Sequence, residues 1–246
     1  MRLTGKTAIV TGGGSGFGAG IVRKFVAEGA KVMIADIDLS AAQTIAAETG
    51  GIALQADVAN NDSVAAMAAA ALAQMGHVDI LINNAGITHL PTPMEDVAED
   101  LFDRVFNVNC KSVYLTAKHL VPHMKSRGTG AILNIASTAG LSPRANLNWY
   151  NASKGWMITA TKTMAVELAP KGIRVNALCP VAGETPLLAS FMGEDTPERR
   201  AAFLSTIPIG RFSTPEDMGN AACYLCSDEA SMVTGVAMEV DGGRCI

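Results

Sequence analysis

Short runs of apolar and β-branched residues alternate along this chain with longer alanine-rich segments of helical periodicity. Strands that are apolar on both faces and separated by helices are typical of a parallel sheet covered on both sides. The pattern therefore predicts an α/β fold, a doubly wound parallel sheet whose strand carboxyl ends share one ligand-binding edge. We expect seven strands, within residues 6–11, 31–36, 51–57, 78–84, 130–137, 172–180 and 236–243.

The length of the chain sets its domain organisation. A chain of 246 residues suits one large core, and we expect a single domain over residues 1–246. Residues 181–215 are rich in Pro and Gly and contain no predicted strand. Long loops in compact domains are usually functional, so this segment is predicted to be a helical lid or substrate-binding loop within the domain.

Composition and charge exclude several classes of protein. No apolar run is long enough to span a bilayer, and the first residues lack an export signal, so we expect a cytoplasmic protein with no membrane partner. The five scattered cysteines fit buried thiols in a reducing compartment. The net charge of -4, with dispersed basic residues, provides no stripe for nucleic acid.

Two pairs of potential metal ligands do not predict a metal site. Cys223 and Cys226 form a C-x-x-C pattern, but it lies in a helical segment with no second ligand pair. His119 and His123 are four residues apart, without a carboxylate at a ligand spacing. We interpret the histidines as part of a surface or subunit-contact face and expect no metal.

A glycine-rich turn follows the first predicted strand. Gly12, Gly16 and Gly18 fall at the turn and at the start of the next helix, with Ser15 and Phe17 between them. Glycine permits positive φ and a close approach of the backbone, and a helix amino end offers free N–H groups to a pyrophosphate. Tight turns also need glycine, so the turn alone is weak evidence for a dinucleotide site.

The end of the second predicted strand strengthens the nucleotide interpretation. Asp36 lies eighteen residues beyond Gly18, near the spacing at which a carboxylate binds the adenosine ribose hydroxyls. A helix-initiating role fits Asp38 better. Neither Ser15 nor Ile37 supplies a positive charge for a 2′-phosphate, so we predict NAD(H) over NADP(H). Asp57 and Val58, which close the third strand, are placed to meet the adenine, although Asp57 equally fits a capping role.

A phenol and an ammonium group share one face of a predicted helix. Tyr150 and Lys154 are four residues apart, a spacing also common on solvated helical faces. A cation about 4 Å from a phenol could lower its pKa by up to roughly three units, enough for acid–base catalysis near neutral pH. Ser137 ends a strand thirteen residues earlier, where it either polarises a substrate oxygen or begins a turn.

The ordered set of motifs resembles the short-chain dehydrogenase/reductase family over essentially the whole chain. The motifs are "TGGGSGFG" from Thr11, "NNAG" from Asn83, Asn109, Ser137 and "YNASK" from Tyr150. The resemblance implies a Rossmann-type fold with a seven-stranded sheet, a nicotinamide cofactor and a homotetramer built on helices around residues 100–127 and 150–169. It implies catalytic roles for Asn109, Ser137, Tyr150 and Lys154, and cofactor contacts at Asn84, Ala85, Gly86, Tyr150, Lys154, Pro180, Val181 and Thr185.

One departure from the family pattern lies after the sixth predicted strand. The family usually has Pro-Gly there, whereas this chain reads "CPVAGET", with Val181 behind Pro180. By the same resemblance, Asn109 holds a water that carries protons from Lys154 toward solvent. A polar residue on an apolar helix otherwise usually caps or kinks it.

The residues expected around the substrate are largely apolar, which predicts a small or medium secondary alcohol or ketone. Arg144 could bind an anionic substrate group, but we interpret it as an exposed loop residue, and the C-terminal tail as able to reach a neighbouring subunit. The favoured function is an NAD-dependent alcohol or sugar dehydrogenase. Alternatives are a 3-oxoacyl-[acyl-carrier-protein] reductase and, with less support, a non-catalytic NAD-binding regulator. The expected lining residues are Leu141, Leu147, Trp149, Leu187, Leu188, Phe191, Met192 and Phe203, with Glu184 and Arg144.

Overall fold

A computed structural model describes all 246 residues and confirms the seven-stranded parallel sheet. The strand order is β3-β2-β1-β4-β5-β6-β7, and every neighbouring pair is parallel. The chain therefore reverses its direction of winding between β1 and β4, which is the switch point of a Rossmann-type sheet. The strands are β1 (Thr7–Thr11), β2 (Lys31–Asp36), β3 (Ile52–Gln55), β4 (Ile80–Asn83), β5 (Gly130–Ile135), β6 (Ile173–Pro180) and β7 (Ala237–Val240).

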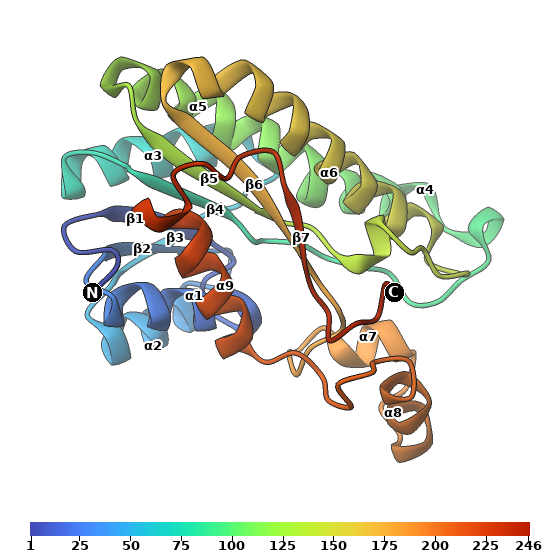
Figure 1. Cartoon of the computed structure of the whole chain (residues 1–246). Coiled ribbons are helices and arrows are strands. Elements are labelled where there is room, and N and C mark those ends of the chain that lie inside the picture. Colours follow the sequence, from blue (N-terminus) through green and yellow to red (C-terminus); the bar gives the residue numbers. More distant parts are fainter.

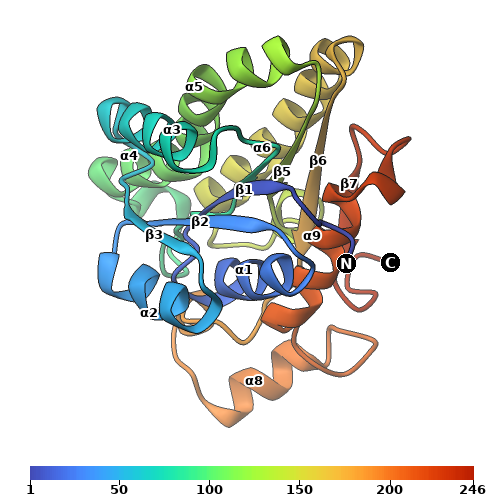
Figure 2. The same cartoon turned by 90° about the vertical axis from the view of Figure 1, so that its left-hand side faces the viewer.

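Helices cover both faces of the sheet (Figure 1, Figure 2). Alternate strand residues pack to opposite sides, since Val10 belongs to the core beneath α1 and α9 while Ile9 belongs to the core beneath α3 and α5. None of the helices combines the length and the apolar character needed to cross a membrane. The helices are α1 (Gly16–Ala27), α2 (Leu39–Thr49), α3 (Asn61–Met75), α4 (Glu99–Phe106), α5 (Ser112–Arg127), α6 (Asn148–Leu168), α7 (Leu188–Met192), α8 (Pro197–Leu204) and α9 (Pro215–Cys226).

Local sequence signals set several helix ends. The Asp38 side chain accepts hydrogen bonds from the Ser40 and Ala41 amides at the start of α2, as expected for a helix-initiating aspartate. At the start of α9, Thr214 and Asp217 form a reciprocal capping box. These caps fix where α2 and α9 begin.

The segment 181–215 contains the two short helices α7 and α8, which extend from the body of the fold beyond the end of β6 (Figure 1). It has a small apolar cluster of its own. Its buried members are Val181, Leu188, Met192, Ile207 and Phe212.

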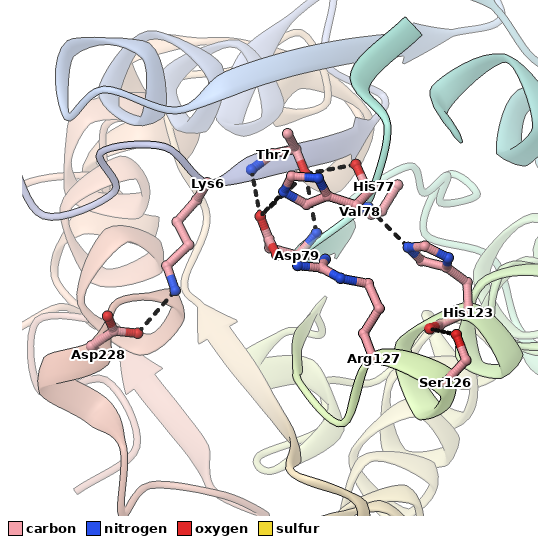
Figure 3. A network of polar contacts seen from close by, with 9 residues as sticks. All are labelled: Lys6, Thr7, His77, Val78, Asp79, His123, Ser126, Arg127 and Asp228. Atoms are coloured by element: carbon pink, nitrogen blue, oxygen red, sulfur yellow. Dashed lines mark hydrogen bonds and ion pairs between the residues drawn. The ribbon is translucent and has the colours of Figure 1, made fainter. Parts of the chain in front are cut away.

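A polar network joins the amino-terminal edge of the sheet, opposite the end of the strands where ligands bind (Figure 3). The carboxylate of Asp79 accepts a hydrogen bond from the Thr7 amide at 2.9 Å and pairs with Arg127 at 2.8 Å and His77 at 3.1 Å. His123 Nε2 accepts the Val78 amide at 3.3 Å. His123 is thus half-buried and bonded within the chain, as is His119, which contacts Asn61.

Replacing Asp79 with asparagine is expected to lower the free energy of unfolding by about 2 kcal/mol at pH 7, because the buried carboxylate loses its charge-assisted hydrogen bond with Arg127. Burial acts to raise the pKa of Asp79, but the Thr7 amide, Arg127 and His77 outweigh it and hold the pKa below its ordinary value. The stabilisation is therefore present above about pH 4 and is lost as the pH falls below it.

Urea unfolding at pH 7 and at pH 3 measures this effect. The difference in the free energy of unfolding between the unmodified protein and the Asp79→Asn variant should be smaller at pH 3. Glu48→Gln is the matched control, since the Glu48–Arg23 pair is about half-exposed and should contribute much less to stability. Equal losses from the two variants would contradict the role given to Asp79.

Candidate active site

A cavity of about 640 Å³ opens at the carboxyl-terminal edge of the sheet. Of the residues expected to act in catalysis or to contact the cofactor, all line it except Gly18 and Asn109. The lining residues that the sequence predicted are Gly12, Ser15, Gly16, Phe17, Asp36, Ile37, Asp57, Val58, Asn84, Ala85, Gly86, Ser137, Tyr150, Lys154, Pro180, Val181 and Thr185.

The glycine turn after β1 has the shape that a pyrophosphate requires. Gly12 and Gly16 have φ of 62° and 51°, which favour glycine. A Cβ at Gly18 would lie 2.1 Å from the carbonyl oxygen of Gly12, so only glycine allows this approach of helix and turn. Ser15 makes no side-chain capping bond, which leaves the amide groups of the first turn of α1 for an anion. These residues fit a dinucleotide.

Asp36 is held at the end of β2 by two backbone amides. Its Oδ2 accepts from Gly14 at 2.9 Å and its Oδ1 accepts from Asp38 at 3.0 Å. Both oxygen atoms retain lone pairs for hydroxyl groups in the cavity. Asp57, by contrast, is exposed and accepts from the Ala59 amide, while Asn60 caps α3. Asp57 therefore does not cap α3, and the capping alternative is wrong. Its side chain accepts a hydrogen bond within the turn before the helix.

The segment after β4 connects the nucleotide end to the catalytic end. Asn84 donates to the carbonyl oxygens of Thr11 and Gly12, both at 2.9 Å, and so closes the glycine turn. A Cβ at Gly86 would lie 3.4 Å from Lys154 Nζ and 3.3 Å from Asn109 Oδ1. The backbone at Gly86 therefore lies close to Lys154 and to Asn109, two of the predicted catalytic residues.

Tyr150 and Lys154 are both buried and lie one turn apart on α6. Lys154 Nζ lies 5.9 Å from the centre of the Tyr150 ring and donates to the carbonyl oxygen of Ile135 at 2.8 Å. Burial lowers the pKa of Lys154 to about 8. The ammonium group is therefore charged at neutral pH and is fixed against the end of β5.

The electrostatics of Tyr150 differ from the sequence prediction. Burial raises the pKa of Tyr150 to about 12, and a hydrogen bond with Ser137 and the charge of Arg144 oppose this rise. Lys154 is not among the groups that shift the pKa of Tyr150. We predicted that Lys154 lowers the pKa of Tyr150 to near neutral pH. This prediction is wrong, because burial raises the pKa by more than any neighbouring charge lowers it.

Ser137 has the turn role that the sequence suggested, and its position in the cavity is compatible with the other role, contact with a substrate oxygen. Its side chain accepts from the Ala139 amide and so begins a short turn. Its hydroxyl also lies within hydrogen-bonding reach of Tyr150 and lines the cavity. A substrate oxygen can therefore meet the serine and tyrosine hydroxyls together.

Asn109 is fully buried in a π-helical turn, Asn107–Lys111, between α4 and α5. Its amide group accepts from the Ile87 amide and donates to the Ile87 carbonyl oxygen, both at 2.9 Å, and it donates to Ser153 at 3.0 Å. Such π-turns often occur at functional sites. The side chain ties the strand-end segment to α6, which agrees with the kink that a polar residue in an apolar helix suggests.

The substrate end of the cavity matches the expected lining residues only in part. Leu187, Phe191 and Phe203 line it as expected, whereas Leu147, Leu188 and Met192 are buried in the core. Arg144 is half-buried and lines the cavity, so its interpretation as an exposed loop residue is wrong. Arg244 of the C-terminal tail also lines this chain's own cavity. Its position depends on tertiary contacts of the tail, which sequence spacing does not show.

A Rossmann-type sheet with a dinucleotide turn and a Ser-Tyr-Lys group in one cavity defines a nucleotide-dependent oxidoreductase. A family model described as enoyl-(acyl carrier protein) reductase matches residues 12–244. A 4-formylbenzenesulfonate dehydrogenase of Comamonas testosteroni is 49% identical over the full length of both chains. A solved 3-ketoacyl-(acyl-carrier-protein) reductase of Brucella melitensis, complexed with NADH, is 50% identical, with a TM-score of 0.95 over 99% of this chain and 100% of that one.

A 3-oxoacyl-[acyl-carrier-protein] reductase of Thermotoga maritima is 38% identical over the full length of both chains. The chain belongs to the short-chain dehydrogenase/reductase family and is an oxidoreductase. The resemblance inferred from the sequence motifs is confirmed.

Proposed function

We propose that the protein interconverts a small or medium secondary alcohol, or a sugar hydroxyl, and its ketone, with NAD(H) as the preferred cofactor and Tyr150 as the acid and base. The observation that supports this most directly is that one cavity contains the glycine turn, Asp36 and the Ser137–Tyr150–Lys154 group. The relatives are named for different substrates, so their names do not identify the substrate of this chain.

The cofactor supplies or accepts the hydride, and the residues of the chain manage the proton. Ser137 orients the substrate oxygen beside Tyr150. A phenol with a pKa of about 12 is protonated at neutral pH and can donate to the oxygen of a ketone as that oxygen gains charge. Oxidation of an alcohol needs the phenolate instead, so its rate should rise with pH. Lys154 and Asn109 are proposed to complete the catalytic group.

The preference for NAD(H) rests on the carboxylate of Asp36. A 2′-phosphate beside Asp36 would bring like charges together, and the Gly14 and Asp38 amides hold the carboxylate in place. The other cofactor contacts proposed are those of the glycine turn and of the segments around Val58, Asn84 and Val181.

Asp36→Ala is expected to weaken NADH binding by about tenfold, because a charge-assisted hydrogen bond to the ribose is lost, and to improve the relative affinity for NADPH. Dissociation constants from nucleotide fluorescence measure both effects. Asp38→Ala is the matched control: it removes only the cap of α2 and should leave the ratio of the two affinities unchanged. An unaltered ratio in the Asp36 variant would remove Asp36 from the cofactor site.

The proposed function is tested by incubating the protein with NAD⁺ and a panel of secondary alcohols and sugars at pH 9 while following reduced nicotinamide. Formation of NADH supports a dehydrogenase. Since two relatives are named as acyl-carrier-protein reductases, the panel should include NADH with a 3-oxoacyl thioester. NADH binding without turnover of any compound would favour a non-catalytic regulator.

Three further features remain predictions. Residues 181–215 are proposed to act as a lid or substrate loop of a single domain, because Leu187, Phe191 and Phe203 of this segment line the cavity. A homotetramer built on α4–α5 and α6 fits the exposed Tyr114, Trp156 and Val166 on two of those helices. A cytoplasmic location remains an expectation from the sequence.

A further inference from the structure

Three arginines have no ion-pair or hydrogen-bond partner for their guanidinium groups, and all three line the active-site cavity. Six of the ten arginines pair with carboxylates. Arg174 donates to backbone carbonyl oxygens instead. The remaining three are Arg104, Arg144 and Arg244. Arg104 is exposed on α4, whereas Arg144 and Arg244 are half-buried at the substrate end.

Arg144 is held in place beside the reacting end of the cavity. Its carbonyl oxygen accepts from the Asn151 side chain on α6 at 2.7 Å, which fixes the loop between β5 and α6. Its guanidinium group lies over the ring of Phe203, 4.7 Å from the ring centre. The charge of Arg144 is close enough to lower the pKa of Tyr150. Arg144 therefore faces the space that a substrate must occupy.

Arg244 is directed toward the cavity by a turn in the C-terminal tail. Both carboxylate oxygens of Asp241 accept backbone amides, one from Gly243 at 2.9 Å and the other from Cys245 at 2.8 Å. Gly242 and Gly243 have φ of 64° and 86°, and a Cβ at Gly242 would lie 2.8 Å from the side chain of Ile207. The tail is therefore built against the segment after α8.

The two guanidinium groups repel each other without a compensating carboxylate. Burial lowers the pKa of Arg144, and the charge of Arg244 lowers it further. The only acidic residues on the cavity wall are Asp36 and Asp57, at the nucleotide end. Like charges that are partly desolvated cost free energy unless an anion lies between or beside them. The substrate end is therefore complementary to a negative group.

We propose that Arg144 and Arg244 form an anion-binding subsite and that the substrate is an organic acid: a hydroxyl or carbonyl compound with a carboxylate or sulfonate at its far end. The apolar stem of this substrate packs beside Phe191 and Phe203, since Phe191 contacts the Tyr150 ring with centres 5.2 Å apart. The inference rests on the proposed oxidoreductase function and specifies its substrate class.

The catalytic test compares 4-oxocyclohexanecarboxylate with its neutral carboxamide as ketones reduced by NADH. We expect kcat/KM to favour the acid by at least tenfold. Arg144→Gln and Arg244→Gln should each reduce this preference by about tenfold, because each removes a charge-assisted hydrogen bond. Any effect of Arg144 on Tyr150 cancels in the ratio, since both ketones use the same phenol. Arg23→Gln, at a half-exposed position that does not line the cavity, is the matched control and should leave the ratio unchanged.

The binding test needs no turnover. Calorimetry measures the affinity of cyclohexanecarboxylate and of its carboxamide for the NADH complex of each protein. The acid should bind more tightly than the amide, and the two arginine variants should lose this difference while keeping their affinity for NADH. Equal binding of acid and amide, or an unaffected difference in both variants, would overturn the subsite.

The two proposals fail in distinguishable ways. Turnover of both ketones at equal kcat/KM would overturn the subsite and leave the oxidoreductase function intact. Selective, arginine-dependent binding of the acid without turnover of any compound in either panel would support the subsite and reject the proposed reaction.

Discussion

Tyr150→Phe should lower the kcat of ketone reduction by about 10²–10⁴-fold while the dissociation constant of NADH changes little. The substitution removes the only proton donor proposed to act on the substrate oxygen. It leaves the ring, which is buried against Phe191 with ring centres 5.2 Å apart, so packing and cofactor binding should persist. Stopped-flow measurement of NADH consumption at saturating substrate reports the chemical step.

A matched control separates loss of the hydroxyl from a general effect on the helices. Tyr114 is more than half-exposed on α5, and Tyr114→Phe should retain normal kcat. A Tyr150→Phe protein that kept most of its activity would assign the proton to another group. A large fall in NADH affinity would mean that Tyr150 mainly holds the cofactor.

The fold could be predicted from the sequence because its signals are local. Each strand is a short apolar run, and β1 and β2 lie within the predicted residues 6–11 and 31–36. The motifs follow strand ends, and parallel strands bring their carboxyl ends to one edge, so Asp36 and Ser137 meet in one cavity without any long-range information.

Features that depend on three-dimensional packing could not be predicted in the same way. The pKa of Tyr150 is set first by burial, which the four-residue spacing to Lys154 does not report. Arg144 appears exposed in the sequence because it lies in a polar loop, yet Phe203, nearly sixty residues later, covers it. Arg244 reaches the cavity only because Asp241 folds the tail into a turn.

These findings change the role expected of Lys154. Its ammonium group donates to Ile135 and lies close to the backbone at Gly86, between the cofactor turn and the catalytic group. Within the chain, the groups that favour the phenolate are Ser137 and Arg144. We therefore propose that Lys154 acts mainly as a buried cation that holds a ribose hydroxyl and adds positive charge beside the nicotinamide.

Lys154→Met should lower kcat/KM by about 10²-fold or more and should also weaken NADH binding, because the substitution keeps an apolar side chain of similar length but removes the charge and the donor. With a pKa of about 8, Lys154 is charged below pH 8 and neutral above it. The affinity of the unmodified protein for NADH should therefore fall as the pH rises through about 8, and the variant should lack this dependence. Titrations of NADH fluorescence from pH 6 to pH 10 measure both curves.

Lys162→Met, at an exposed position on α6, is the control and should follow the unmodified protein. If the NADH affinity of the Lys154 variant showed the same pH dependence, another group would be responsible for the titration. Lys154 would then act only as a hydrogen-bond donor to Ile135. A loss of kcat/KM without any change in NADH affinity would place the charge with the reacting oxygen rather than with the ribose, because a cation that binds the cofactor must affect its dissociation constant.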